Sequence, residues 1–421
     1  SLPKTNETMT EPTTGLKLTR LTDSSTLDGT DDAFVSYSRY SPENSSGNLF
    51  LSFGSNSYSS WVINRITGKT IAKLFGPKGK TIGEYHEVRW DNSGKYPNRL
   101  YYRDGMKLMQ INDVYNHNKT TSVIKDFSKH FPKSTLIYND VEGDSSNDSD
   151  HWAFMAAHYD GKTNVVDAFI HYQISTDTIH SLAPKQLEKT KLRHYAEQDT
   201  FPRPNMVEIS PKGDGIVLHY SRAWGNEEYG NRSKDINTWF DGPYLWPLDF
   251  NIGKTSPKKI SIDSTHSGWS FDKKGDSYFV SQNNRNDYID AVPISDNKAM
   301  RIGSHKDMGW SNGFHFGKMP PSKPNWSLVS TYSKNENNAE NQEWAANQIF
   351  LLELKPLHQK NRVLRIGPTY NKFTGNYRDE AVAAINLAGN RIYFSSNWGG
   401  KIKHREIFVY ELPDNWQEIL H

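Results

Sequence analysis

Hydrophobic and polar positions alternate along this chain in a repeated unit: an apolar strand, a turn that ends in Gly, and an aromatic strand. Four segments show it, at 86–105, 206–222, 269–285 and 383–400, with turn glycines Gly94, Gly213, Gly275 and Gly389. These glycines lie two, one and two steps of about 60 residues apart. Segments 151–173 and 325–335 occupy the two vacant steps, and a further strand pair at 33–54 precedes the first repeat. The pattern predicts seven units.

Seven short-stranded units favour an all-β fold, a single seven-bladed β-propeller. We expect residues 1–14 to be a disordered lead-in and residues 15–421 to form the propeller domain. The C-terminal strand at 406–413 should pair with N-terminal strands, because closing the ring removes exposed strand edges. The polar insertions at 142–150 and 333–343 are too long for tight hairpins. Such loops gather on one rim of a propeller, where sites are built.

Composition narrows the function classes. The chain has 50 basic and 48 acidic residues, so its net charge of +2 argues against a nucleic-acid partner. No apolar run reaches the roughly 20 residues that a membrane span requires. The absence of cysteine excludes a disulfide framework, a Cys-ligated metal and a thiol nucleophile. The first residues show no basic-then-apolar leader, and we expect a secreted protein whose signal peptide is not in this sequence.

Three histidines are candidate metal ligands. His86, His266 and His315 each stand at the start of a repeat's first strand, and equivalent positions of different blades converge on the central channel. Three imidazoles there could bind zinc or a similar ion. The alternative is that they are hydrogen-bonded channel residues.

A second constellation combines His, Tyr and Arg. His151 opens one strand and His171 ends the next, so a turn at Asp160-Gly161 would place both imidazoles at the same end of one blade. The next blade offers the candidates Tyr220, Arg222 and Arg232. Arginine can hold a carboxylate with two hydrogen bonds, while His and Tyr can transfer protons. Together they supply what β-elimination on a uronic acid requires. No G-x-S-x-G, H-E-x-x-H or P-loop motif occurs.

The blocks at 86–105, 139–155, 266–285, 313–317, 325–332, 348–356 and 391–400 resemble the seven-bladed propeller ulvan lyases of polysaccharide lyase families 24 and 25. The resemblance runs from about residue 80 to the C-terminus and keeps blade order. It implies eliminative cleavage of ulvan, a sulfated algal polysaccharide, at glucuronic or iduronic acid next to rhamnose-3-sulfate. The product would be an unsaturated uronate.

The resemblance also assigns residues. It implies His151 and His171 as the catalytic histidine pair, Arg232 as the carboxylate clamp, and Tyr220 as the proton-transfer residue. Tyr244 is the reserve for Tyr220, and Tyr244 and Arg222 are expected to bind substrate. Catalysis would need no metal, although a structural zinc or calcium ion remains open, and the enzyme would act as a monomer. Val382 stands where many relatives place a channel histidine.

Two rival interpretations stay open. The first is a metal-dependent lyase of the oligogalacturonate type, whose working ion would be held by the channel histidines. The second is a carbohydrate-binding propeller without catalytic activity, because a fold does not determine a function.

Overall fold

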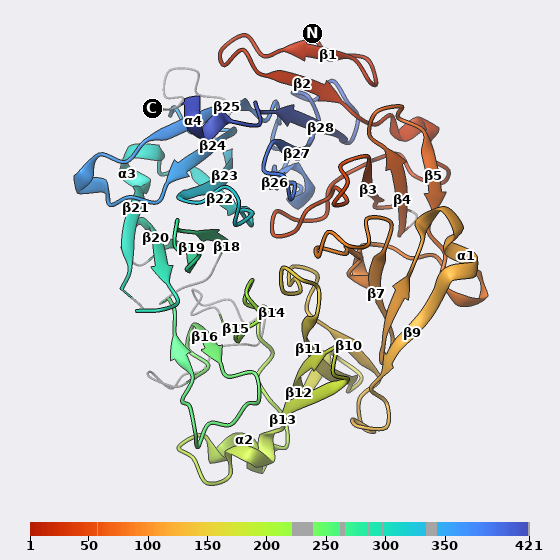
Figure 1. Ribbon diagram of the computed structural model, residues 1–421, viewed down its shortest axis with the longest axis vertical. Helices are drawn as coiled ribbons and strands as arrows, with labels where there is room; N and C mark the ends of the chain where they lie inside the picture. Colours follow the sequence, from red (N-terminus) through yellow and green to blue (C-terminus); the bar gives the residue numbers. More distant parts are fainter. Residues whose placement is uncertain are drawn as a thin grey trace. The chain divides into compact units, whose positions relative to one another are not determined.

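The computed structural model describes residues 1–56, 58–220, 239–261, 266–284, 286–296, 298–333 and 343–419. Its strands form seven antiparallel sheets, and the fold is the predicted seven-bladed β-propeller (Figure 1). The chain divides into two compact units, Ser1–Glu84 with His266–His421 and Tyr85–Thr265. Within the described ranges, no helix combines the length and the apolar character that a membrane crossing demands.

The first unit holds four sheets. Three of them follow chain order: β3 (Leu49–Gly54), β4 (Ser59–Asn64) and β5 (Thr70–Lys73); β18 (Ser267–Phe271), β19 (Ser277–Asn283), β20 (Tyr288–Pro293) and β21 (Met300–Ser304); β22 (Asn312–Phe316), β23 (Trp326–Ser333), β24 (Gln348–Glu353) and β25 (Val363–Pro368). The fourth has the order β1 (Thr8–Thr10), β2 (Lys17–Arg20), β28 (Glu406–Glu411), β27 (Arg391–Ser396) and β26 (Ala384–Ile385). Both ends of the chain therefore contribute to one sheet.

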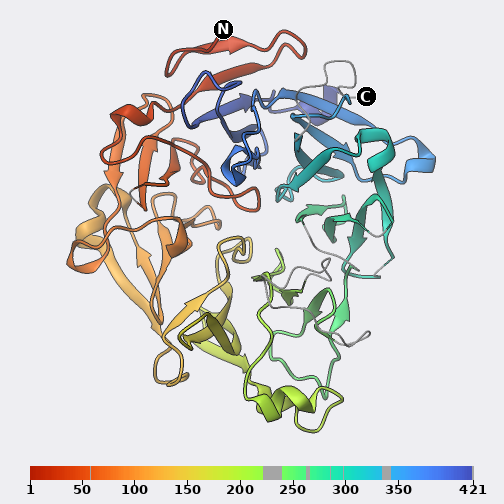
Figure 2. The ribbon, with the colours of Figure 1, turned by 180° about the vertical axis from the view of Figure 1, so that it is seen from behind.

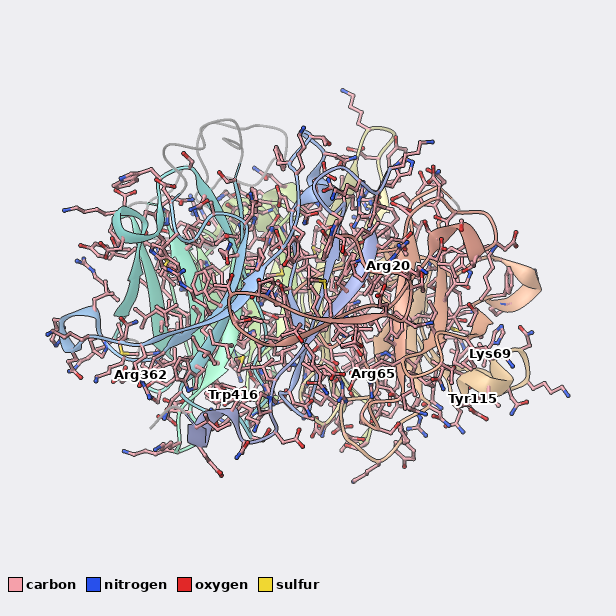
Figure 3. The ribbon with its side chains drawn as sticks, turned by 90° about the horizontal axis from the view of Figure 1, so that it is seen from above. Arg20, Arg65, Lys69, Tyr115, Arg362 and Trp416 are labelled. Carbon is pink, nitrogen blue, oxygen red and sulfur yellow. The ribbon has the colours of Figure 1, made fainter. Side chains whose placement is uncertain are left out.

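The pairing of β2 with β28 confirms the expected contact between N-terminal strands and the C-terminal strand. Leu18 lies opposite Tyr410, and the hairpin of β1 and β2 runs along the outer edge of β28 (Figures 1 and 2). The edge of β28 is thereby covered, which removes a site for aggregation. The short helix α4 (Trp416–Ile419) follows β28 along the chain. Its Trp416 (Figure 3) packs against Trp326, with the ring centroids 5.8 Å apart.

The predicted disorder of residues 1–14 is wrong. Thr8–Thr10 pairs with β2, and the carboxylate of Glu11 accepts hydrogen bonds from the backbone N–H groups of Thr13 and Thr14, at 2.9 and 2.7 Å. The Thr14 hydroxyl donates to the Ile366 carbonyl at 2.9 Å, which ties the segment to β25. Buried hydrogen bonds of this kind order a polar segment that composition alone assigns to a loose terminus.

The segment ahead of the first repeat also differs from expectation. Only its second half becomes a regular strand, β3, whereas the first half contributes isolated bridges, Phe34 with Phe53 and Glu43 with Phe50. The sheet that contains β3 consequently has three strands, β3, β4 and β5.

Glu43 in this segment is the centre of a buried polar cluster. Its side chain is 2% exposed and accepts two hydrogen bonds from the Arg391 guanidinium, both at 2.7 Å. The Asn386 amide donates to the same carboxylate at 2.9 Å, and the Tyr393 hydroxyl donates as well. The hydrogen bonds with Glu43 raise the pKa of Arg391, so the guanidinium stays protonated. The cluster joins the segment before β3 to the sheet that contains both chain ends.

The second unit holds three sheets. They are β6 (Arg89–Trp90), β7 (Leu100–Asp104), β8 (Lys107–Ile111) and β9 (Thr121–Asp126); β10 (Leu136–Tyr138), β11 (His151–Tyr159), β12 (Asn164–Gln173) and β13 (Thr178–Leu182); and β14 (Met206–Ile209), β15 (Ile216–His219), β16 (Pro243–Trp246) and β17 (Lys258–Lys259). Segment 151–173, which occupies one of the vacant steps of the repeat, supplies the second and third strands of its sheet. The first strand, β10, has only three residues and carries too little alternation to be recognised.

We expect Glu43→Gln to lower the free energy of unfolding by about 3 kcal/mol, because the half-buried Arg391 guanidinium would lose its buried counter-charge. Chemical denaturation measures the change. Asp28→Asn is the matched control: Asp28 also faces a cation, Lys73 at 3.2 Å, but its side chain is 92% exposed, so stability should stay close to that of the unmodified protein. Equal stability of the two variants would contradict the role given to Glu43.

Candidate functional site

Three stacked imidazoles lie on one face of the sheet β10–β13. His151 Nδ1 is 2.9 Å from His171 Nε2, and His171 Nδ1 is 3.1 Å from His180 Nδ1. The ring centroids are 5.2 and 5.4 Å apart, and the rings are tilted by only 12° and 17°. The prediction that His151 and His171 share one end of a blade is confirmed, and His180 joins them.

Strand register accounts for the stack. His171 lies directly opposite His180 in the β12–β13 pair and opposite Ala153 in the β11–β12 pair. His151 is two residues from Ala153, and side chains two residues apart point to the same face of a strand. The β11–β12 turn is held by Asp160, whose carboxylate accepts the backbone N–H groups of Lys162 and Thr163 at 2.8 and 2.9 Å. His171 therefore lies diagonally across the β11–β12 pair from His151 and directly across the β12–β13 pair from His180.

The three rings differ in how far they are buried. His171 is 1% exposed, while the side chain of His151 is 15% exposed and His180 is half-buried. Burial first, and then the neighbouring His151 and His180, lowers the pKa of His171 to about 3. The middle ring is thus neutral at ordinary pH, and only the outer rings have access to solvent.

Asp150 adds a negative charge beside the stack. Its carboxylate is 3.9 Å from His151 Nε2 and accepts hydrogen bonds from the Ser175 N–H and the Gln173 amide, at 2.7 and 2.9 Å. Burial would raise its pKa, but the hydrogen bonds from Ser175 and Gln173 and the charge of His151 hold it below the usual value. Asp150 therefore stays negatively charged at a position where it could stabilise a protonated His151.

The loop before His151 is held rigidly. The buried carboxylate of Glu87 accepts the backbone N–H groups of Asn139 and Val141, at 2.8 and 2.9 Å, and Arg89 donates to the Gly143 carbonyl at 2.7 Å. Val141 has a φ of 70°, which is strained for a β-branched side chain. Strain of this kind persists only where surrounding contacts enforce it, and it concentrates at functional sites.

A turn of the neighbouring sheet approaches His151 closely. Gly213, with a φ of +73°, stands so near the imidazole that an added Cβ would lie 2.8 Å from His151 Cδ2. Only glycine suits this position, both for its backbone angle and for the space. The turn that contains Gly213, one of the turn glycines of the repeat, therefore lies directly beside the His151 ring.

The hydroxyls of Tyr220 and Tyr244 make hydrogen bonds to Pro202 and Asp241. Gly213 precedes β15, whereas Tyr220 follows it, and a four-residue strand separates its two ends by roughly 13 Å. Tyr220 is 0% exposed and its hydroxyl donates to the Pro202 carbonyl at 2.7 Å. A proton-transfer role near neutral pH would require a lowered pKa, whereas burial raises the pKa of Tyr220 well above the usual value.

Tyr244, the reserve, is also buried. Its hydroxyl donates to Asp241 at 2.9 Å, and burial and this bond raise its pKa. The hydroxyl is therefore occupied within the protein, which argues against the expected contact with substrate. Arg222 and Arg232 lie outside the described residues, so their predicted roles stay predictions.

The predicted metal ligands fall in different units, His86 in Tyr85–Thr265 and His266 and His315 in the other. The rings of His266 and His315 are 4.3 Å apart, and burial lowers the pKa of each to about 3. His315 Nε2 is 2.8 Å from a Glu380 oxygen, so that nitrogen is already engaged. Among the described residues, no group of three or more His, Asp or Glu side chains is arranged to hold a metal ion. The zinc or calcium site stays a prediction.

His180 is the residue that sequence reasoning missed. A signal for it exists: Gln173 pairs with Thr178 across a four-residue turn, and that register places residue 180 opposite residue 171. The turn 174–177 has no glycine, so it did not stand out as a hairpin turn.

Comparison with known proteins yields fold likenesses alone. No protein-family model and no curated protein matches the chain. Among solved structures, an oligogalacturonate lyase from Vibrio parahaemolyticus has a TM-score of 0.58 at 10% identity, and the match covers 97% of each chain. The β-propeller domain of Cps50 from Myceliophteria thermophila has a TM-score of 0.46 at 13% identity, covering 91% of this chain and 99% of that one. The likeness to the lyase is a likeness of fold.

The buried neutral His171 should make the protein sensitive to acid. The unfolded chain takes up a proton near pH 6.5 and the folded chain only near pH 3, so stability is lost as pH falls through this window. In His171→Gln this loss disappears. We expect the stability difference between about pH 7.5 and about pH 5 to shrink by about 2 kcal/mol.

Urea unfolding at the two pH values measures the difference. His130→Gln, at an exposed position of the same unit, is the control and should behave as the unmodified protein does. An unchanged pH dependence in His171→Gln would show that His171 titrates normally.

Proposed function

We propose that this protein is a polysaccharide lyase that cleaves ulvan by β-elimination. The scissile bond is the 4-linkage of a glucuronic or iduronic acid next to rhamnose-3-sulfate, and the product is an unsaturated uronate. The observation that carries the proposal is the His151–His171 pair: one imidazole is partly exposed and the other is buried, and a 2.9 Å hydrogen bond joins them.

β-Elimination requires a base for the C5 proton and an acid for the leaving O4. The exposed edge of His151 suits both tasks, since imidazole accepts and donates protons near neutral pH. The hydrogen bond with His171 fixes the orientation of the ring and so determines which nitrogen faces substrate. Asp150, 3.9 Å from Nε2, would favour the ring after it has taken a proton.

The carboxylate of the uronate must also be neutralised, because charge develops next to it when the C5 proton leaves. Arg232 remains our candidate for this role, with Arg222 as a further contact to substrate. A guanidinium suits the task, because its planar fork binds a carboxylate with two hydrogen bonds. The proton-transfer role first given to Tyr220 passes in this proposal to His151, since a buried tyrosine of raised pKa cannot reach substrate.

The name of one structural neighbour supports the class of reaction. Oligogalacturonate lyase is, by its name, a lyase for a uronate, and ulvan contains uronates too. Since a shared fold does not determine a shared function, this support is limited to the class. The proposal includes secretion and action as a monomer, with no nucleic-acid or membrane partner and with any zinc or calcium ion in a structural role.

Incubation with ulvan tests the proposal, because the conjugated double bond of the product absorbs ultraviolet light. His151→Asn should reduce turnover by about 10²- to 10⁴-fold, the contribution typical of a general acid–base. His158→Asn is the matched control. His158 lies near the other end of the same strand and pairs with Asp167 at 2.8 Å, so its loss should leave turnover within a few-fold of the unmodified rate.

Three outcomes contradict parts of the proposal. Binding of ulvan without absorbance would favour the carbohydrate-binding propeller. Activity on oligogalacturonate that disappears on chelation would favour the metal-dependent rival. Equal turnover of His151→Asn and His158→Asn would remove His151 from the mechanism.

Tyr220→Phe separates a structural from a catalytic tyrosine. Removing the hydroxyl leaves the Pro202 carbonyl without its buried donor, so we expect the free energy of unfolding to fall by about 1 kcal/mol. Turnover should stay within a few-fold of the unmodified rate. A folded variant that had lost nearly all turnover would return the proton-transfer role to Tyr220.

A further inference from the structure

We infer that His151, His171 and His180 form a proton relay, in which His180 is a positioning residue that links the site at His151 to solvent. The direction in which the relay is used rests on the proposed function, but its existence does not. Two contacts carry the inference, the 2.9 Å distance between His151 Nδ1 and His171 Nε2 and the 3.1 Å distance between His171 Nδ1 and His180 Nδ1.

Counting protons shows what this geometry allows. A neutral imidazole has one N–H and one bare nitrogen, and each N···N contact holds one proton. Three neutral rings carry three ring protons, of which the two contacts hold two. The third proton sits on one of the two outer nitrogens, His151 Nε2 or His180 Nε2. The neutral stack therefore has two arrangements, and a proton shift through both contacts converts one into the other.

The middle ring suits a relay because it stays neutral. His171 is 1% exposed, its two ring nitrogens face other imidazoles, and the ring also makes a hydrogen bond with the Leu248 backbone. The groups that act on it are His151, His180, the Leu248 backbone and Asp150, and burial is the strongest influence on its pKa. A ring that resists protonation passes a proton on without storing charge. His180, which is half-buried on β13, is the ring that can exchange its proton with water.

The relay accounts for each proton that the proposed elimination moves. In one arrangement His151 Nε2 is bare and takes the C5 proton; the C5–H electrons form the C4=C5 double bond, and the C4–O4 bond breaks. The proton on His151 Nδ1 moves to His171, that on His171 Nδ1 moves to His180, and His180 Nε2 releases one to water. His151 Nε2 then gives its proton to the leaving O4. His180 Nε2 takes a proton from water, the proton on His180 Nδ1 moves back to His171 Nδ1, and the proton on His171 Nε2 moves back to His151 Nδ1. The stack returns to its first arrangement.

Nitrogen-15 NMR of the full chain with labelled histidine tests the relay without substrate, because the shifts of Nδ1 and Nε2 report which nitrogen is protonated. At a pH where the rings are neutral, the protonated fractions of His151 Nε2 and His180 Nε2 should add up to one. If both outer nitrogens carry a full proton, the inference is overturned. This measurement needs no variant.

His180→Gln provides the second arm, since an amide can hydrogen-bond but cannot pass a proton through its ring. We expect the balance between the two His151 tautomers to change, kcat to fall about 10-fold, and KM to stay within about two-fold. The solvent deuterium isotope effect and the pH–rate profile should change as well, which a purely structural residue would not cause. His130→Gln should change none of these. An unchanged His151 tautomer in His180→Gln would overturn the relay.

The two proposals fail separately. If the unmodified protein forms no unsaturated product from ulvan, the proposed function fails, while the NMR result for the tautomers still stands or falls by itself. If ulvan is cleaved and His180→Gln turns it over with unchanged kcat and isotope effect, the relay fails and the lyase remains.

Discussion

The register of antiparallel strands is the constraint on which the other features depend. Backbone hydrogen bonds fix which residues face each other, and the two-residue alternation then decides which side chains share a face. In the sheet β10–β13 this places three imidazoles in a row. In the sheet with both chain ends it sets Leu18 opposite Tyr410 and covers the edge of β28. A shift by one residue in either pair would turn the side chains to the opposite face.

Burial then determines the charge state of the groups that register brings together. His171, His266 and His315 are buried, and burial lowers the pKa of each to about 3, even though His315 Nε2 lies 2.8 Å from a Glu380 oxygen. Glu43 is equally buried but has a guanidinium, an amide and a phenol around it. One kind of buried group is therefore neutral. The other is an ion pair that holds segments of the chain together.

The site combines rigid and exposed parts in a way that suits proton transfer. Glu87 and Arg89 bind the backbone of the loop before His151. The backbone of Gly213 lies close beside the ring, with no side chain between them. The surrounding protein therefore holds the His151 imidazole in place, while part of the ring stays accessible to solvent. Precise positioning of an acid–base group accounts for a large part of the rate enhancement that an enzyme achieves, because the group needs no reorganisation during the reaction.

The sequence by itself determined the features that depend on local pattern. Turn glycines at a regular spacing predicted the seven sheets, and the turn at Asp160-Gly161 predicted that His151 and His171 lie together. The need to close the ring and leave no exposed strand edge predicted that 406–413 pairs with N-terminal strands. Strand period and turn chemistry act over a few residues, so they can be recognised without a structure. Only the tertiary structure decided the burial of Tyr220, the ordering of residues 1–14 by Glu11, and the place of His180 in the stack. Each of these depends on contacts between elements whose packing no local pattern encodes, because burial and pKa are set by whatever surrounds a side chain in space.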